Sequence, residues 1–263
     1  MFKNLFNKKK EVPVEVKQDW AVYFCLVDSC QASVRLNLSL NEIAPIEDYK
    51  YRTWFSVKLL DPDENGFTTR EEYPKICQIE DDILDALMKK GVIMAGAVKT
   101  NGVFDLYLYS KSVEGYEEII NSVMKAHADY KYATDFKEDV SWDDYFNFLY
   151  PSEYEYQTIQ NQRVLMSLEE HGNDPEKERE VDHWIYFKTA GDMENYIRKV
   201  EETGYKVLSN TKLDDDKTYP YQLNISRQDN TVWSRVNDYV WELIVLANEN
   251  DGNYDGWGCP IAK

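Results

Sequence analysis

The alternation of apolar and polar residues along the first half of the chain predicts a sheet. Between Ser33 and Leu40 every second residue is apolar, which predicts a strand with one side facing water. The near-continuous apolar run from Trp20 to Val27 predicts a buried strand. Asn101-Gly102 predicts a tight turn between two strands of a hairpin. Further strands are expected over residues 51–60, 91–98, 103–109 and 130–134.

Two amphipathic helices are expected between these strands. Their apolar stripes are Ile76, Ile79, Ile83, Leu84 and Leu87 in one helix and Tyr116, Ile119, Ile120, Val123 and Met124 in the other. Thr68 with Glu71, or Thr69 with Glu72, forms a candidate capping box, although Pro74 fits best at a first helical position. A short helix is expected over 142–150. This element order indicates an antiparallel sheet with helices on one face.

The second half repeats the mixture of helix and strand. Helices are expected over 153–170, 189–200 and 231–248, with strands around 183–187, 205–208 and 221–225 and a glycine-rich tail. This order is close to a ferredoxin-like split βαβ arrangement. We therefore expect an α+β protein of two domains, each an antiparallel sheet with helices packed on it: residues 17–151, and a ferredoxin-like domain at 152–263. A flexible N-terminal arm over 1–16 would precede them.

Charge narrows the range of partners. The 263 residues include 48 acidic and 30 basic side chains, a net charge of −18, and 43% are hydrophobic, which is enough for a substantial core. Phosphate backbones repel such a chain, so we expect no direct nucleic-acid partner and favour a basic protein segment. We expect no membrane partner, because no apolar run approaches the roughly 20 residues that span a bilayer. The start of the chain does not resemble a signal peptide and the four cysteines form no CxxC pair, so a cytoplasmic location is expected.

Motifs of catalysis are scarce. The chain has no GxGxxG, GxxxxGK[ST], GxSxG or HExxH sequence, so we expect a protein that is not an enzyme and needs no cofactor or metal. His183 falls on the apolar side of a predicted strand, where a buried, hydrogen-bonded histidine is more common than a metal ligand. The alternative left open is a metal-dependent hydrolase that uses carboxylates such as Asp174, Asp214 and Asp255 with His171 or His183.

Two acidic runs are weaker candidates for cation binding. Asp214-Asp215-Asp216 lies in an expected loop and does not match a calcium-loop pattern. Asp251, Asn253 and Asp255 alternate before Gly256, as in such a loop, but the glutamate that should follow is missing. A structural turn is the interpretation that we favour for the second run.

The second half resembles the bacterial regulator of ribonuclease E activity B (RraB) family. The resemblance covers about Tyr154 to Ile261. It rests on Leu168-Glu169-Glu170-His171-Gly172-Asn173-Asp174-Pro175, His183, Gly204-Tyr205 and Tyr254-Asp255-Gly256-Trp257-Gly258. The resemblance implies a ferredoxin-like domain that inhibits a ribonuclease by binding its non-catalytic region. The residues that it nominates for binding are Asp174, His183, Tyr254, Asp255, Gly256, Trp257 and Gly258.

The first half resembles an uncharacterised bacterial domain that is often fused to RraB-like domains. The resemblance rests on Trp20-Ala21-Val22-Tyr23, Asp61-Pro62, Glu80-Asp81, Gly96 and the segment 142–151. This resemblance indicates how the chain is divided into domains and implies no activity. The sequence thus favours a regulatory protein that binds a basic segment of a ribonuclease and so modulates RNA turnover. An acidic immunity-type inhibitor of a nuclease toxin is a further alternative.

Two roles are open for Trp257. In the first, which we favour, glycines on either side permit an unusual backbone while Trp257 packs on the sheet. In the second, Trp257 is an exposed anchor of an interface, where tryptophan is enriched. The two roles differ in whether the indole is buried.

Overall fold

The chain forms two compact units, Met1–Ser152 (unit 1) and Glu153–Lys263 (unit 2). The computed structural model describes residues 14–214 and 218–263. Each unit contains one antiparallel sheet with helices, so the prediction of two α+β domains is confirmed. Residues 1–13 of the expected N-terminal arm lie outside the described residues, as do Asp215 and Asp216.

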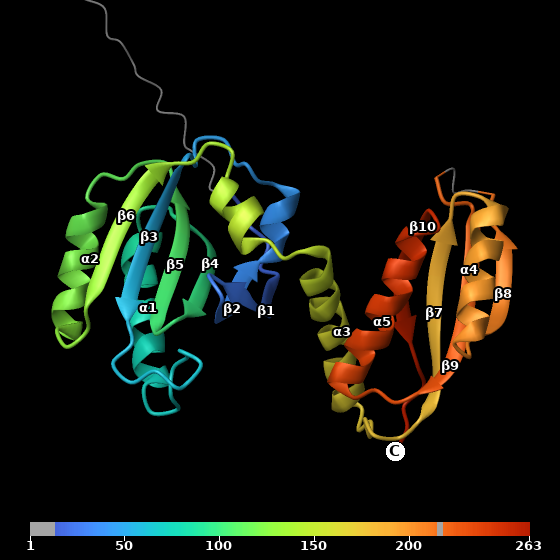
Figure 1. The fold of residues 1–263 in the computed structure, drawn as a ribbon. Helices are drawn as coiled ribbons and strands as arrows, with labels where there is room; N and C mark the ends of the chain where they lie inside the picture. Colours follow the sequence, from blue (N-terminus) through green and yellow to red (C-terminus); the bar gives the residue numbers. More distant parts are fainter. Residues whose placement is uncertain (1–13, 215–217) are drawn as a thin grey trace, which may run out of the picture. The chain divides into compact units, whose positions relative to one another are not determined.

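Unit 1 is built on a six-stranded antiparallel sheet (Figure 1). Its strands are β1 (Trp20–Val27), β2 (Cys30–Asn37), β3 (Tyr51–Lys58), β4 (Ile93–Thr100), β5 (Val103–Ser110) and β6 (Tyr132–Glu138). They lie in the order β1-β2-β4-β5-β3-β6. Asn101 and Gly102 both have positive φ, 47° and 75°, as the predicted tight hairpin turn between β4 and β5 requires.

Helices α1 (Tyr73–Met88) and α2 (Tyr116–Met124) pack on one face of this sheet. Their apolar stripes meet central strands in a core that includes Phe55, Leu106, Ile79, Ile83 and Ile120. Short turns of helix occur at η1 (Leu38–Glu42) and η2 (Lys125–His127). The expected helix at 142–150 is the π-helical turn η3 (Tyr145–Leu149), which packs on the opposite face against β2 and β4.

Strand β1 differs from the prediction of a buried strand. It is an edge strand, and only its odd-numbered side is covered: Ala21 and Tyr23 are buried, whereas Phe24 and Leu26 are each 70% exposed. The prediction was wrong for the even-numbered side because the core under α1 and α2 is formed with β3, β4 and β5 and does not extend to β1.

Two other local predictions need correction. The strand expected to continue to Leu40 ends at Asn37, whose side-chain oxygen accepts a hydrogen bond from the Ser39 amide at 3.2 Å and so starts η1. Neither capping box forms at α1. The Glu72 carboxylate instead accepts hydrogen bonds from the amides of Leu60 (2.7 Å) and Asp61 (3.1 Å), and Pro74 lies in the first turn.

Unit 2 has a four-stranded antiparallel sheet in the order β10-β7-β9-β8. Its elements are α3 (Glu153–Glu170), β7 (Arg179–Phe187), α4 (Ala190–Glu202), β8 (Lys206–Lys212), β9 (Tyr221–Asp229), α5 (Trp233–Asn248) and β10 (Gly252–Gly258). Helices α4 and α5 pack on the sheet, and α3 packs on α5 (Figure 1). The ferredoxin-like assignment rests on this order of elements and stays a prediction.

Candidate functional site

The residues of the expected site on β10 lie against β7, with a bulge between them. Tyr254 is opposite Ile185 and Gly256 is opposite Trp184, so Asp255 is the extra residue of the bulge. Gly256 has φ +153°, a conformation that side-chain-bearing residues rarely adopt. The Asp255 side chain is exposed. The bulge thus turns a carboxylate outward at the edge of the sheet.

Trp257 points into unit 2. Its side chain is 7% exposed, and it packs with Val236 and Val240 of α5. The indole N–H donates a hydrogen bond to Oδ1 of Asn161 on α3 at 2.9 Å, and the Asn161 amide donates to Asn237 on α5 at 2.8 Å. Trp257 therefore connects the edge strand to both helices. A direct contact of Trp257 with a partner stays a prediction.

His183 lies in a buried cluster of aromatic side chains. It is 1% exposed, its Nδ1 shares a 2.8 Å hydrogen bond with the Tyr254 hydroxyl, and the rings of Tyr205 and Tyr239 lie edge-on at 5.6 Å. Burial, and then the charge of Arg227, lower the pKa of His183 to about 3. The imidazole is therefore neutral near pH 7, and burial likewise raises the pKa of Tyr254.

Asp174 lies in the loop between α3 and β7, held by the C-terminal tail. Gly172, with φ +77°, ends α3 in the left-handed conformation. The Asp174 amide donates to the Ala262 carbonyl at 2.7 Å, and the Arg179 guanidinium donates to the Asp174 carbonyl. The Asp174 carboxylate is partly exposed and accepts a hydrogen bond from the Glu176 amide at 3.1 Å. This carboxylate lies on a loop whose backbone is well fixed.

A groove of about 460 Å³ lies beside the Asp174 loop, between α3 and the start of α5. We call it the α3–α5 groove. Its lining residues are Gln162, Leu165, Met166, Glu169, Asn173, Pro175, Glu176, Thr231, Val232 and Trp233. Met166 (54% exposed) and Trp233 (45%) are accessible apolar side chains, and among the described lining residues Glu169 and Glu176 are the charged ones. The groove therefore combines accessible apolar side chains with acidic ones.

Sequence reasoning did not identify this groove. The sequence pattern predicts two apolar stripes on these helices, formed by Ile159, Val164, Leu165 and Leu168 and by Val232, Val236, Val240, Leu243 and Ala247. Met166 and Trp233 lie outside these stripes, and apolar residues outside a stripe are the signal that indicates accessible apolar side chains. Asp174 was nominated, and its neighbours Asn173 and Pro175 line the groove. Six of the nominated residues, His183 and Tyr254 to Gly258, lie on the paired strands β7 and β10, whereas Asp174 lies apart in the loop between α3 and β7. The six do not form an open site, because His183 and Trp257 are buried.

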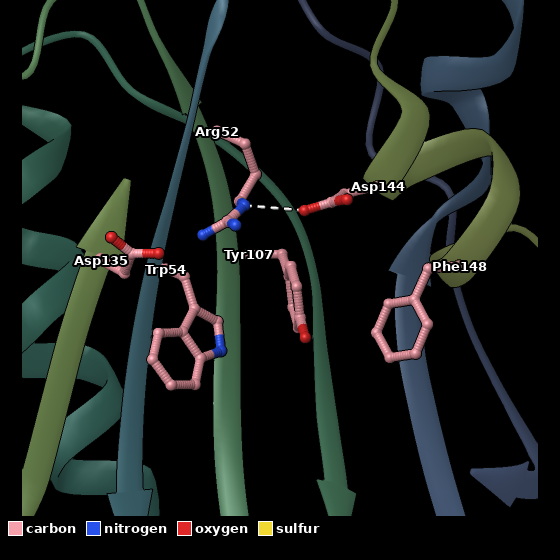
Figure 2. A pocket seen from close by; sticks show the side chains of 6 residues that line it. All are labelled: Arg52, Trp54, Tyr107, Asp135, Asp144 and Phe148. Atoms are coloured by element: carbon pink, nitrogen blue, oxygen red, sulfur yellow. Dashed lines mark hydrogen bonds and ion pairs between the residues drawn. The ribbon is translucent and has the colours of Figure 1, made fainter. Parts of the chain in front are cut away.

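Unit 1 contains a second pocket, of about 450 Å³, on the sheet face opposite α1 and α2 (Figure 2). Its lining residues are Arg52, Trp54, Tyr107, Asp135, Asp144 and Phe148. The strand register explains its composition: Trp54 on β3 lies opposite both Tyr107 on β5 and Asp135 on β6. The Asp144 carboxylate accepts hydrogen bonds from Arg52 Nε at 2.7 Å and from Lys137 Nζ at 2.6 Å.

The segment 139–150 holds Asp144 and Phe148 at this pocket. Trp142 has φ +59°, its ring lies on Tyr109, and its indole N–H donates to the Tyr49 carbonyl at 2.8 Å. The Asp139 carboxylate accepts hydrogen bonds from the Tyr109 hydroxyl (2.7 Å) and the amides of Asp143 (2.8 Å) and Asp144 (3.1 Å). A left-handed tryptophan followed by a π-helical turn is an uncommon backbone of the kind enriched at functional sites.

The described residues include no candidate metal centre. Nowhere among residues 14–214 and 218–263 do three His, Cys, Asp or Glu side chains come together to hold a metal ion. The carboxylate of Asp214 belongs to a run whose other two members are not described. Within the same described ranges, the structure contains no helix with the length and apolar character needed to span a bilayer.

Fold and geometry together define a protein of two α+β domains. Residues 18–150 match the family model described as a family of unknown function (DUF695), and the chain belongs to this family. Residues 158–259 match the family model "Regulator of ribonuclease activity B". Both resemblances expected from the sequence are thereby confirmed.

Other comparisons add little. A search of curated proteins finds no match. Among solved structures, an unknown protein from Galdieria sulphuraria shares 10% identity over 81% of this chain and 99% of its own, with a TM-score of 0.23. A mutant chlorite dismutase from Candidatus Nitrospira defluvii shares 7% identity over 81% of this chain and 92% of its own, also with a TM-score of 0.23. Likenesses this low carry no information on function.

Proposed function

We propose that this chain is a non-enzymatic regulatory protein that binds a ribonuclease and lowers its activity. The match of residues 158–259 to the regulator family carries this proposal. The four cysteines, all among the described residues, are not joined in disulfides, which fits a reducing compartment such as the cytoplasm. In this proposal unit 2 makes the contact, because it is the part that matches the regulator family.

The α3–α5 groove is the docking site in this proposal. Its partly exposed Met166 and Trp233 supply apolar area of the kind that anchors interfaces, and its described lining residues include Glu169 and Glu176 but no lysine or arginine. A groove lined by apolar and acidic side chains complements a segment that carries both basic and apolar side chains. The partner segment is therefore a basic, partly apolar stretch of the ribonuclease.

The overall charge favours the same partner. A net charge of −18 attracts basic segments over distance, so association is expected to be fast at low ionic strength and to weaken as salt is added. The same charge opposes direct binding of RNA. Regulation in this proposal therefore acts through the enzyme's protein surface and not through its substrate.

The test is capture of partners from the native cell extract by the full chain, at low and at high salt, followed by mass spectrometry and a ribonuclease assay. We expect a ribonuclease to be retained at low salt, to be lost at high salt and to be less active when bound. The variant Glu169→Lys/Glu176→Lys replaces the two acidic side chains of the groove by basic ones and should abolish capture. The matched control Glu201→Lys/Glu202→Lys changes the same charge on exposed positions of α4 and should retain it.

Three outcomes would contradict the proposal. Retention of no ribonuclease would contradict the function, and equal loss in both double variants would contradict the groove as the docking site. Capture of a ribonuclease with unchanged activity would contradict inhibition. A Trp233→Ala variant tests the apolar part of the groove separately, because it changes no charge, and it is expected to weaken capture at low salt.

A further inference from the structure

The Figure 2 pocket belongs to unit 1, to which the proposed ribonuclease contact assigns no role. Its volume of about 450 Å³ is within the range of sites that hold small molecules. Half of its described lining residues are aromatic and half are charged. The pocket therefore combines ring surfaces with hydrogen-bonding groups, which is the composition of a site that selects a small aromatic ligand.

The indole of Trp54 is surrounded by the other groups of the pocket. The strand register places Trp54 opposite Tyr107 on one side and Asp135 on the other, and Arg52 lies two residues earlier on the same face of β3. Tyr107 and Phe148, whose ring centroids are 5.5 Å apart, extend the aromatic surface. A flat ligand ring stacked on Trp54 therefore has Arg52 and Asp135 as neighbours at its edges.

Asp144 fixes the guanidinium of Arg52. The Arg52 Nε donates to Asp144 at 2.7 Å, and the Arg52 side chain is only 11% exposed. In Figure 2 the other two nitrogens lie on the side of the guanidinium turned away from Asp144, and they form no hydrogen bond with another residue of the described ranges. A guanidinium held in this way offers a fork of N–H donors to acceptor atoms of a ligand.

Asp135 supplies hydrogen-bond acceptors beside the same ring. Its side chain is exposed, and within the described part of the chain it has neither a hydrogen-bond donor nor an ion-pair partner. An ionised carboxylate with two available oxygens can accept hydrogen bonds from two adjacent N–H groups of a ligand. The Figure 2 pocket thus presents donors from Arg52 and acceptors from Asp135 next to the Trp54 indole.

The charges around the pocket balance. Arg52 and Lys137, which donates to Asp144 at 2.6 Å, offset the carboxylates of Asp135 and Asp144. The local charge therefore favours neither a strongly cationic nor a strongly anionic ligand, and the net charge of −18 opposes ligands that carry phosphate. The ligand that complements this pocket is an uncharged aromatic ring with acceptors on one edge and donors on the next.

Guanine has this pattern of acceptors and donors. Its O6 and N7 are neighbouring acceptors that match the fork of an arginine, and its N1–H and amino group are neighbouring donors that match a carboxylate. A purine ring also stacks well on an aromatic side chain. We propose that the Figure 2 pocket binds guanine, as the free base or the nucleoside. The ring stacks on Trp54, O6 and N7 accept from Arg52, and N1–H and the amino group donate to Asp135.

The first test is equilibrium dialysis of the full chain against radiolabelled guanosine. We expect saturable binding with a dissociation constant of about 10–100 µM. Adenosine has an amino group in place of O6 and lacks N1–H, so it should bind at least about tenfold more weakly. Absence of saturable guanosine binding, or equal affinity for adenosine, would overturn the proposal. Binding of choline in preference to guanosine would also overturn it, because the aromatic rings would then select a cation.

Variants assign the binding to this pocket. Trp54→Leu removes the stacking surface and should raise the dissociation constant for guanosine about tenfold or more. Asp135→Asn, at an exposed position of the edge strand β6, should weaken guanosine binding about tenfold and reduce the preference for guanosine over adenosine. The control Asp129→Asn removes the same charge at an exposed position outside the described lining and should leave the affinity unchanged. An Asp135→Asn chain that is folded by circular dichroism and keeps the wild-type preference would overturn the proposal.

Discussion

The ring of Trp142 lies flat on the ring of Tyr109, with centroids 3.8 Å apart and planes 6° from parallel. This stack joins the segment 139–150 to the centre of the unit 1 sheet. It also holds Trp142 in a left-handed conformation that a tryptophan rarely adopts. The pocket of Figure 2 depends on this stack, because its lining residues Asp144 and Phe148 lie two and six positions after Trp142 in the same segment.

We expect Trp142→Ala to destabilise unit 1 by about 3–5 kcal/mol, because it removes a fully buried ring and its hydrogen bond to Tyr49. Urea unfolding of the full chain measures the change, and hydrogen exchange resolved by peptide assigns it to unit 1. Val140→Ala, two residues away and exposed, should change stability by less than about 0.5 kcal/mol. Similar effects of the two substitutions would show that the stack contributes little.

Asp139 should make unit 1 sensitive to acid. Although burial alone would raise the pKa of Asp139, hydrogen bonds from Tyr109 and from the amides of Asp144 and Asp143 lower it below its ordinary value. A lowered pKa in the folded state means that the stabilisation is present above the pKa of the unfolded chain and is lost as pH falls through the folded pKa. Asp139→Asn should therefore unfold at lower urea concentration near pH 7.

The measurement is the urea midpoint of unit 1 between pH 7 and pH 3 for the wild type and Asp139→Asn. The difference between the two proteins should shrink as pH falls. A difference that stays constant over this range would mean that the charge of Asp139 contributes nothing to the stability of unit 1.

His183 should make the stability of unit 2 depend on pH, at higher pH values than Asp139 does for unit 1. The folded pKa is about 3, whereas a solvated histidine has a pKa of about 6.5. Between these values the unfolded chain binds a proton that the folded chain does not, so stability falls as pH decreases below about 6.5. From pH 7 to pH 5 the loss is about 2 kcal/mol.

Replacement of the imidazole tests this assignment. His183→Gln should lower the stability of unit 2 near pH 7, because the aromatic cluster loses a well-packed ring, but it should flatten the change between pH 7 and pH 5. Urea unfolding at pH 7 and at pH 5 measures the change in the stability of unit 2 for the wild type and the variant. An unchanged slope in the variant would assign the pH dependence to other groups.

Trp257 and Asn161 should be coupled. Trp257→Phe keeps most of the buried ring but removes the N–H donor, which leaves Asn161 with one hydrogen bond fewer in a buried position. We expect a loss of about 1–3 kcal/mol. Asn161→Leu should be costly alone but less so beside Trp257→Phe, and a double-mutant cycle by urea unfolding measures the coupling. Simple additivity would show that the hydrogen bond is not important.

Local features of the fold could be predicted from the sequence. The Asn101-Gly102 turn was predicted correctly because the backbone preference resides in the two residues themselves. The stripe of Ile76, Ile79 and Ile83 likewise marked α1, although not its first residue. Features that depend on strand order could not be predicted. The apolar run of β1 is compatible with a central or an edge strand, and only the pairing of β2 with β4 places β1 at the edge.

The binding surfaces were the least predictable part. The α3–α5 groove joins residues from two helices and a loop, and no local pattern connects Met166 with Trp233, which lies 67 positions later in the chain. The Figure 2 pocket has the same origin, because the register of β3 with β5 and β6 brings Trp54, Tyr107 and Asp135 together. Asp174 was found because it belongs to a motif, and motifs are local.

The position of β3 has a consequence for synthesis on the ribosome. Strands β1 and β2 form a hairpin as soon as both have emerged, but β3 pairs only with β5 and β6, which are translated much later. Until Val103–Ser110 has left the exit tunnel, the Tyr51–Lys58 segment has no native strand partner and exposes Phe55 and Val57. The nascent chain should therefore pass through a prolonged interval in which it depends on chaperones, and this interval ends only when the last strands of unit 1 are complete.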